Sequence, residues 1–278
     1  MDLSHFPFGG GQRGRTFDRQ YFYKKTMKYN RPIVLSIAGF DPTGGAGVLA
    51  DVKTFEQHGC LGMAVLTGNT NQTESEFLAV SWFGKDSLIA QLLPILKNYE
   101  VAAVKIGIVE NLDTLAAILA LLKASFPQIP VVWDPVLTAS SGFELHASWN
   151  RETLQRILEL VYLVTPNLSE VKKLTELDDE IAGSLELAKF AHVLLKGGHH
   201  SERLGVDLLF EGGIPVELPV QLETADCSPK HGSGCILSAA ITANLALGND
   251  LPTACKNSKN YIEERLASNP NLLAYHVR

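Results

Sequence analysis

The chain has 278 residues, of which 46% are hydrophobic and 19% are charged, and its formal net charge is −6. This length allows one large or two small domains with a full core, and the acidic balance excludes most nucleic-acid binders, which need clustered positive charge. No apolar run approaches the roughly 18 residues of a membrane span, the N-terminal residues lack the charged-then-apolar layout of a signal peptide, and the four cysteines form no C-x-x-C pair. We therefore expect a cytoplasmic protein without disulfides, a zinc site or a membrane partner.

The N-terminal segment differs from the rest of the chain in composition. Residues 1–31 hold seven Lys or Arg against two Asp and show no strand or helix pattern. A polar, charged segment of this kind cannot bury enough apolar surface to offset the entropy cost of folding. We predict that residues 1–31 form a disordered extension and that residues 32–278 form a single domain.

From residue 32 onward, short β-rich runs alternate with helical patterns, which is typical of a mostly parallel sheet covered by helices. The predicted strands cover residues 32–38, 62–67, 101–106, 130–134, 161–165 and 192–196. The predicted helices cover residues 45–58, 85–98, 111–124, 151–160, 167–175, 184–190, 233–247 and 251–267. Residues 206–210 and 214–220, which flank Glu211-Gly212-Gly213, instead predict an antiparallel hairpin at one sheet edge.

The segment after the first predicted strand is rich in glycine. Residues 45–50 read Gly-Ala-Gly-Val-Leu-Ala, which formally matches the permissive dinucleotide pattern G-x-G-x-x-G/A. A nicotinamide site also needs an acidic residue after the second strand, where residues 67–69 are Thr-Gly-Asn, and the chain has no G-x-x-x-x-G-K-[ST] motif. We interpret the glycines as letting the backbone close over a small flat substrate. On sequence alone, Asp51 is expected to be a solvated helix carboxylate.

Residues 232–235, Gly-Ser-Gly-Cys, stand where a long apolar helix is expected to begin. A helix start offers unpaired backbone N–H groups and a partial positive charge, so small residues there let an anion sit directly on the backbone. Gly232, Ser233 and Gly234 would then hold a phosphoryl group in transfer, and Cys235 would stand at the reacting centre. An ordinary glycine turn followed by a small buried cysteine explains the four residues equally well.

Polar residues also follow three later strands. Asn167 and Glu170 are three apart at a helix start, which suits either a Mg²⁺ ion held by oxygen ligands or a helix capping box. Asp134 ends a strand and is a candidate for binding the metal or phosphates, with a loop anchor as the alternative. Lys196 ends the apolar strand that contains residues 193–195 and could pair with a phosphate as a point charge.

Taken together, these segments resemble the hydroxymethylpyrimidine/phosphomethylpyrimidine kinase family. The similar motifs follow in the family's order within about residues 32–245: AGFDPTGGAG (38–47), ADVKTF (50–55), KIG (105–107), DPV (134–136), TPNLSE (165–170), KGGH (196–199) and HGSGC (231–235). Each motif alone is weak, but the set is specific. The resemblance implies a three-layer α/β/α ribokinase-like fold, in agreement with a mostly parallel sheet with antiparallel edge strands, and ATP and Mg²⁺ as cofactors.

Carried over residue by residue, the resemblance also assigns roles. It makes residues 232–235 the anion hole, with Cys235 where most ribokinase-like enzymes place an aspartate base, and a helix start is expected to lower the thiol pKa toward neutrality. The Gln72 amide offers both a donor and an acceptor to an aminopyrimidine edge. The implied sites are substrate binding by Gln72, Gly39, Asp51, Ala46 and Ile108, nucleotide binding by Lys196, Asp134 and Thr165, and magnesium binding by Asn167 and Glu170.

The function that the resemblance implies is ATP-dependent phosphorylation of 4-amino-5-hydroxymethyl-2-methylpyrimidine and its monophosphate in thiamine biosynthesis, by a homodimer. A pyridoxal kinase on the same fold is an alternative, because its substrate is also a flat ring with a hydroxymethyl group, and a non-catalytic ligand-binding relative is another. The chain departs from the family's pattern at Lys230, where a threonine usually precedes His-Gly, and in residues 271–278, which lack the usual ending.

Overall fold

The structure, a computed structural model, describes residues 29–137, 151–198, 203–222 and 227–277. The predicted disordered extension therefore lies, except for its last three residues, outside the described residues. Its last residue, Arg31, forms an ion pair with Glu56 at 2.6 Å. None of the helices in the described ranges is long and apolar enough to cross a membrane.

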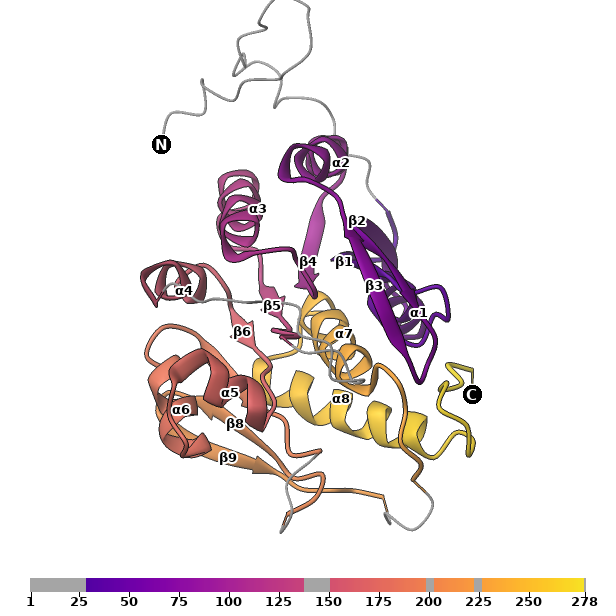
Figure 1. The fold of residues 1–278 in the computed structure, drawn as a ribbon, viewed down its shortest axis with the longest axis vertical. Helices are drawn as coiled ribbons and strands as arrows, with labels where there is room; N and C mark the ends of the chain where they lie inside the picture. The colour runs from indigo at the N-terminus through magenta and orange to yellow at the C-terminus, as the bar shows by residue number, and fades with distance from the viewer. Residues whose placement is uncertain (1–28, 138–150, 199–202, 223–226, 278) are drawn as a thin grey trace, which may run out of the picture.

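Nine strands of the described residues form one sheet in the order β3-β2-β1-β4-β5-β6-β7-β8-β9 (Figure 1). The neighbouring pairs from β2 to β7 are parallel, whereas β2–β3, β7–β8 and β8–β9 are antiparallel. The strands are β1 (Ile33–Phe40), β2 (Leu61–Gln72), β3 (Phe77–Trp82), β4 (Val101–Ile106), β5 (Val131–Trp133), β6 (Leu163–Val164), β7 (His192–Leu195), β8 (Asp207–Glu211) and β9 (Ile214–Leu218).

Helices cover both faces of this sheet (Figure 1). Those in the described residues are α1 (Gly47–Gln57), α2 (Lys85–Asn98), α3 (Leu112–Ser125), α4 (Arg151–Leu158), α5 (Leu168–Thr175), α6 (Glu180–Leu187), α7 (Ser233–Ala246) and α8 (Leu251–Leu266). Helices α1, α7 and α8 pack on one face, and α2 to α6 pack on the other. The prediction of a three-layer α/β/α fold with antiparallel edge strands is confirmed.

The central strand β1 shows why the sequence folds this way. Ile33, Leu35 and Ile37 are buried against the layer of α2 and α3, while Val34, between them, is buried against Phe55 of α1 on the other face. A strand covered on both faces needs an almost continuous apolar run, and parallel strands are covered in this way by their crossover helices. The carboxyl ends of β1 and its neighbours consequently point to one edge of the sheet.

Three elements differ from the sequence-based expectation. Strand β2 continues to Gln72, five residues beyond its predicted end, because its last residues pair with β3. Strand β3 was not predicted, because Leu78 and Ala79 are exposed and the strand pairs only with β2 at the sheet edge. Helix α6 begins four residues before the predicted start. The reason is local: the Asp179 side chain accepts hydrogen bonds from the backbone N–H groups of Ile181 and Ala182 and so caps the helix there.

Candidate active site

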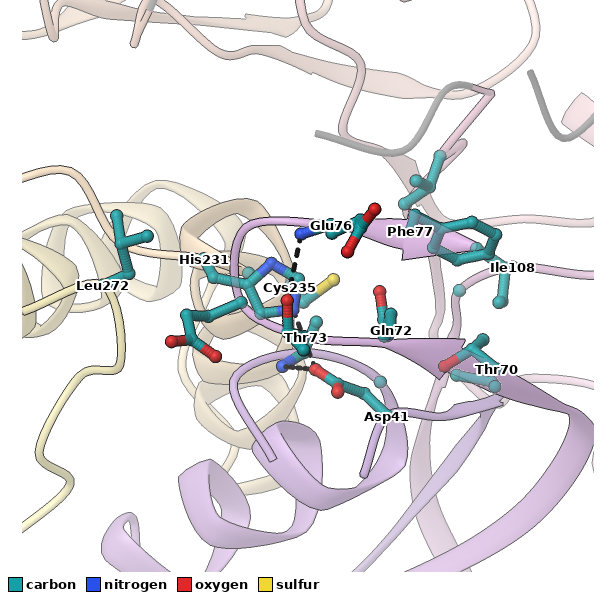
Figure 2. A pocket seen from close by; sticks show the side chains of 18 of the residues that line it. Asp41, Thr70, Gln72, Thr73, Glu76, Phe77, Ile108, His231, Cys235 and Leu272 are labelled. Carbon is teal, nitrogen blue, oxygen red and sulfur yellow. Dashed lines mark hydrogen bonds and ion pairs between the residues drawn. The ribbon is translucent and has the colours of Figure 1, made fainter. Parts of the chain in front are cut away.

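A cavity of about 380 Å³ lies at the carboxyl ends of β1, β2 and β4. Its wall is formed by the loop after β1, the β2–β3 hairpin, the residues after β4, the start of α7 and Leu272 from the C-terminal segment. Figure 2 shows Gln72 and Ile108 on one side of the cavity and His231 and Cys235 on the other. Parallel strands whose carboxyl ends meet at one edge bring these distant segments together.

Four of the five residues predicted to bind the substrate line this cavity: Gly39, Ala46, Gln72 and Ile108. A Cβ atom on Gly39 would lie 2.4 Å from Cδ1 of Ile108, so a side chain there would have to displace the Ile108 side chain. The Ile108 side chain thus packs across the glycine, and Phe77 also lines the cavity (Figure 2). A cavity with such an apolar wall and one amide side chain suits a flat ring with a hydrogen-bonding edge.

The fifth predicted residue, Asp51, is not in the cavity wall and is not solvated. It is fully buried, with Oδ1 at 2.5 Å from the Lys105 ammonium, and Oδ2 accepts a hydrogen bond from the Ser36 hydroxyl at 2.6 Å. The sequence-based expectation of a solvated carboxylate is wrong, because α1 packs this residue against the face of β1 and β4. Lys105 itself lines the cavity, so Asp51 can influence a ligand indirectly through Lys105. Burial alone would lower the pKa of Lys105, but the interactions with Asp51, Cys235 and Asp134 together outweigh burial and raise the pKa.

The start of α7 forms a wall of the cavity. Gly232 has φ 73°, and a Cβ atom there would lie 2.1 Å from the carbonyl oxygen of Gly45, so both its backbone conformation and its surroundings require glycine. No side chain of the described residues caps this helix, and the Ser233 backbone N–H donates a long hydrogen bond of 3.3 Å to the Lys230 carbonyl oxygen. A helix start without a side-chain cap can offer backbone N–H groups to an anion. Ser233 and Gly234 follow as the first residues of the helix, and neither lines the cavity.

Cys235 lines the cavity, but its acidity differs from the expectation. Burial raises the pKa of its thiol to about 11, and the nearby Lys105 charge, which lowers the pKa, only partly offsets the effect of burial. The prediction that the helix start lowers this pKa toward neutrality is therefore wrong in direction. Removal from water penalises the thiolate more than the end of one helix stabilises it. At neutral pH the residue is a protonated thiol.

A second polar cluster lies next to the start of α7, outside the cavity wall. The Lys196 ammonium is 2.8 Å from Asp134 Oδ1 and 3.7 Å from Glu170 Oε2. Burial raises the pKa of Asp134, but the charges of Lys196 and Lys105 and the hydrogen bonds from Lys196 and Ser238 together outweigh burial and keep the pKa below its usual value. A Cβ atom on Gly234 would lie 3.3 Å from the Lys196 ammonium, so this cation is in van der Waals reach of the helix start.

Thr165 belongs to the same cluster and orients its carboxylate. Its hydroxyl donates a hydrogen bond to Oδ1 of Asp134 at 3.3 Å, while Ser238 of α7 donates to Oδ2 at 2.9 Å. Asp134 is thus tied both to a neighbouring strand end and to α7. The structure brings the three predicted nucleotide-binding residues together, and their role remains a prediction.

Asn167 and Glu170 form a complete capping box at the start of α5. The Asn167 side chain accepts a hydrogen bond from the Glu170 backbone N–H at 2.9 Å, and the Glu170 carboxylate accepts one from the Asn167 backbone N–H at 2.7 Å. The capping interpretation is therefore confirmed. Burial raises the pKa of Glu170 to about 7, against the lowering effect of Lys196.

The same two residues fit a magnesium ion only as partial ligands. The described residues contain no group of three or more His, Cys, Asp or Glu that could hold a metal by themselves. Mg²⁺, however, usually keeps several waters and takes one or two protein carboxylates together with substrate phosphates. The buried Glu170 carboxylate, in the same polar cluster as Asp134 and Lys196, fits a magnesium ion that is bound by few protein ligands. It does not fit an ion that is coordinated by protein groups alone.

A model of the family described as phosphomethylpyrimidine kinase matches residues 41–278. The chain belongs to this family. A hydroxymethylpyrimidine/phosphomethylpyrimidine kinase of Rhizobium meliloti is 38% identical over 248 residues, which cover 85% of this chain and 91% of the relative. A solved phosphomethylpyrimidine kinase of Clostridium difficile is similar with a TM-score of 0.71 and 33% identity, over 84% of this chain and 99% of that one. The protein is therefore a phosphotransferase.

The fold neighbours of this kinase include a second vitamin kinase. A Bacillus subtilis pyridoxal kinase, solved with ADP, is similar with a TM-score of 0.74 and 29% identity, over 86% of this chain and 93% of that one. Both kinds of relative share the ribokinase-like architecture seen here. The likeness to pyridoxal kinases shows that the backbone alone does not decide between the two ring substrates.

The kinase also holds functional candidates that the sequence did not reveal. The His231 ring nitrogen Nε2 is 2.8 Å from Asp41 Oδ2, which joins the loop before α7 to the loop after β1. Burial would raise the pKa of Asp41, but hydrogen bonds from His231 and from Thr43 outweigh it and lower the pKa. Asp41 and His231 are 190 positions apart, and each appeared in the sequence only as a letter of its own motif.

Proposed function

We propose that this kinase transfers the γ-phosphoryl group of ATP to the hydroxymethyl group of an aminopyrimidine, and then to the resulting monophosphate. The curated relatives carry the name hydroxymethylpyrimidine/phosphomethylpyrimidine kinase, which supports this substrate. One structural observation carries the proposal. The start of α7 contributes Cys235 to the cavity wall, and one residue earlier, at Gly234, it reaches the Lys196 ammonium. A single short segment therefore touches an acceptor pocket and a cation suited to phosphate.

On the acceptor side, the ring would lie against Ile108 and Ala46, with its amino edge at the Gln72 amide. An amide can accept a hydrogen bond from the exocyclic amino group and donate one to a ring nitrogen at the same time. This orientation directs the hydroxymethyl group toward Cys235 at the base of α7. Holding the two reactants in line is the main contribution that a protein can make to phosphoryl transfer.

On the donor side, the backbone N–H groups of residues 232–235 and the Lys196 ammonium would receive the transferring phosphoryl group. Donors that point at developing charge in a water-poor site stabilise a transition state without reorganising. Glu170 and Asn167 would hold Mg²⁺ together with the phosphates, and the ion, when bound, neutralises phosphate charge. Asp134 keeps Lys196 paired before the nucleotide arrives.

The Cys235 thiol would shape the anion hole and would not act as a preformed base. A thiol with a pKa of about 11 is almost fully protonated at neutral pH. The transition state of phosphoryl transfer is loose, and the hydroxyl proton can leave late, so a strong base is not required. A neutral thiol of this size leaves the neighbouring backbone N–H groups accessible to the phosphoryl oxygens.

The test is ATP consumption by the purified protein with Mg²⁺, with hydroxymethylpyrimidine, its monophosphate and pyridoxal as separate acceptors. Turnover of both pyrimidines would support the two-step proposal, and turnover of the alcohol alone would limit it to the first step. Lys196→Met should abolish turnover, whereas Lys189→Met, which removes an exposed lysine of a surface ion pair, should leave it unchanged. A wild-type protein that consumes no ATP with either pyrimidine would contradict the proposal.

Pyridoxal phosphorylation is the second candidate function. Staphylococcus aureus pyridoxal kinase, solved with pyridoxal, is similar with a TM-score of 0.74 and 26% identity, over 86% of this chain. The ring preference in the assay above decides between the two.

We also propose a homodimer, supported by the edge strand β3 and its exposed Leu78, to be checked by light scattering. A Leu78→Lys variant that leaves the measured mass unchanged would argue against that face.

A further inference from the structure

We propose that Lys230 holds the C-terminal segment, residues 267–277, beside the acceptor cavity, so that Leu272 of this segment limits the size of the cavity and determines ring specificity. The inference deepens the proposed function and rests on the cavity being the acceptor site. It begins from two departures from the family's pattern, Lys230 and the chain ending, which lie far from each other in the printed sequence. In the structure they contact each other directly.

Lys230 is a buried cation whose partners are backbone carbonyls of this segment. Its ammonium donates hydrogen bonds to the carbonyl oxygens of Asn269 and of Asn271, the latter at 2.6 Å. Only 6% of the residue is exposed, and no carboxylate in the described part of the chain forms an ion pair with it. Burial lowers the pKa of this ammonium. Within the described residues, the charge is thus compensated by the carbonyl dipoles of this segment, which the same hydrogen bonds help to position.

The next residue continues the attachment and places Leu272. The backbone N–H of His231 donates to the carbonyl oxygen of Leu272 at 2.8 Å, and Leu272 lines the cavity beyond His231, as Figure 2 shows. The segment also packs on the loop after β1, since a Cβ atom on Gly45 would lie 2.8 Å from Cδ2 of Leu273. Two consecutive residues at the entry to α7 therefore hold the backbone on both sides of the residue that enters the cavity.

The far end of the segment is fixed independently of Lys230. The Arg265 guanidinium donates to the carbonyl oxygen of His276 at 3.2 Å, and the Tyr261 hydroxyl is 3.2 Å from Nδ1 of His276. The segment consequently spans from α8 past the cavity and back to α8. Loss of the Lys230 contacts would remove two of the hydrogen bonds that position its middle, where Leu272 lies, and would leave the bond from the His231 N–H and the far end in place.

The consequence is a selective effect on the acceptor. Lys230 touches neither the cavity nor the Lys196 cluster, so it is a positioning residue that acts through Leu272. One apolar group in a binding pocket discriminates between related substrates by about 10-fold or somewhat more. Removing the Leu272 side chain, or releasing the backbone that holds it, should weaken binding of the small pyrimidine and favour a ring with bulkier substituents. The affinity for ATP should not change.

The experiment compares Lys230→Met, Leu272→Ala, the double variant and the control Lys189→Met, with wild type as reference. KM and kcat are measured for hydroxymethylpyrimidine, for pyridoxal and for ATP. We expect both single variants to raise the KM for the pyrimidine about 10-fold and to raise the ratio of kcat/KM for pyridoxal to that for pyrimidine. The double variant should equal Lys230→Met, because both changes act through one contact. Lys230→Arg should restore part of the effect, since a guanidinium can also donate to two carbonyls.

The outcomes separate this inference from the proposed function. If wild type turns over the pyrimidine and the variants change no acceptor KM, the role of the segment is refuted and the function stands. If the variants lower kcat and raise the KM for ATP as well, the segment is merely structural. If wild type binds the rings in calorimetry but turns nothing over, the proposed function is refuted. The role of the segment is then tested by comparing the dissociation constants of pyridoxal and the pyrimidine between wild type and the variants. If neither ring binds, both are refuted. Leu272→Ala keeps the test decisive if Lys230→Met does not fold.

Discussion

Replacing Lys105 with methionine should leave a buried carboxylate without its cation and destabilise the folded state. Lys105 and Asp51 are both fully buried, and besides Lys105 the Asp51 carboxylate accepts only the Ser36 hydroxyl among the described side chains. In the variant, Asp51 must remain charged with one hydrogen bond or take up a proton. Protonating a carboxyl of ordinary pKa about 3.9 at pH 7 costs about 4 kcal/mol. This agrees with the roughly 3–5 kcal/mol that breaking a buried ion pair costs.

The sign of the pH dependence distinguishes this mechanism from a simple packing defect. In Lys105→Met, the folded state holds a proton that the unfolded state releases above pH 4, so the cost of the substitution should fall by about 1.4 kcal/mol per unit as the pH decreases from about 7 to 5. In Asp51→Asn the buried group left behind is Lys105, so that cost should fall as the pH rises. It should also be smaller, because Asp134 also attracts the Lys105 ammonium.

Urea unfolding followed by circular dichroism at several pH values measures these free energies. The matched control is Arg31→Met, which breaks an ion pair of 2.6 Å whose side chains are 45% and 41% exposed. That variant should lose less than about 1 kcal/mol at every pH. A cost for Lys105→Met below about 1 kcal/mol at pH 7, or one that does not change with pH, would refute the reasoning.

Three further predictions concern the cavity. Because burial raises the pKa of Cys235 to about 11, its alkylation rate, followed by peptide mass, should keep rising through about pH 10, and a plateau near neutrality would contradict this. Gly232→Ala should lower kcat at least about 100-fold, because its Cβ would meet the Gly45 carbonyl at 2.1 Å; Gly248→Ala, at φ 87° with open surroundings, should leave kcat unchanged. Gln72→Ala should raise the acceptor KM at least about 10-fold with an unchanged KM for ATP, and equal effects on both would disprove a ring contact.

The layers of the fold could be predicted because the strands and the helices have different and clear hydrophobic patterns. Buried parallel strands such as β1 read as continuous apolar runs, and the helices between them have apolar stripes. Strand β3 could not be predicted, because it is a half-exposed edge strand whose partner is set by the hairpin. The start of α6 depends on a single side chain, Asp179, which caps the helix by accepting hydrogen bonds from two adjacent backbone N–H groups. Helix starts and edge strands of this kind depend on individual hydrogen bonds, which the hydrophobic pattern of the sequence does not reveal.

The site could be predicted only in part, for a similar reason. Positions that must be small or polar next to a strand end, such as Gly39 and Gly232, are visible in the sequence. Contacts between segments are not: Asp51 and Lys105 are 54 positions apart, and no spacing rule connects them. The acidity of Cys235 also depends on how deeply the site is buried, which a sequence does not give. Helix position argues for a lower pKa, and burial reverses the sign.

Two buried ion pairs near the start of α7 also favour an anion at the start of this helix. Lys105 pairs with Asp51 and Lys196 with Asp134, and each carboxylate is almost inaccessible to water. Buried pairs of this kind contribute little net stability, since apolar residues of similar volume often do as well or better. The same cations in a low-dielectric environment act on a phosphoryl group far more strongly than surface lysines would. The Lys196 side chain is 12% exposed and its ammonium lies near Gly234, so Lys196 can exchange part of its pairing with Asp134 for a phosphate. The Lys105 side chain is fully buried and remains paired with Asp51.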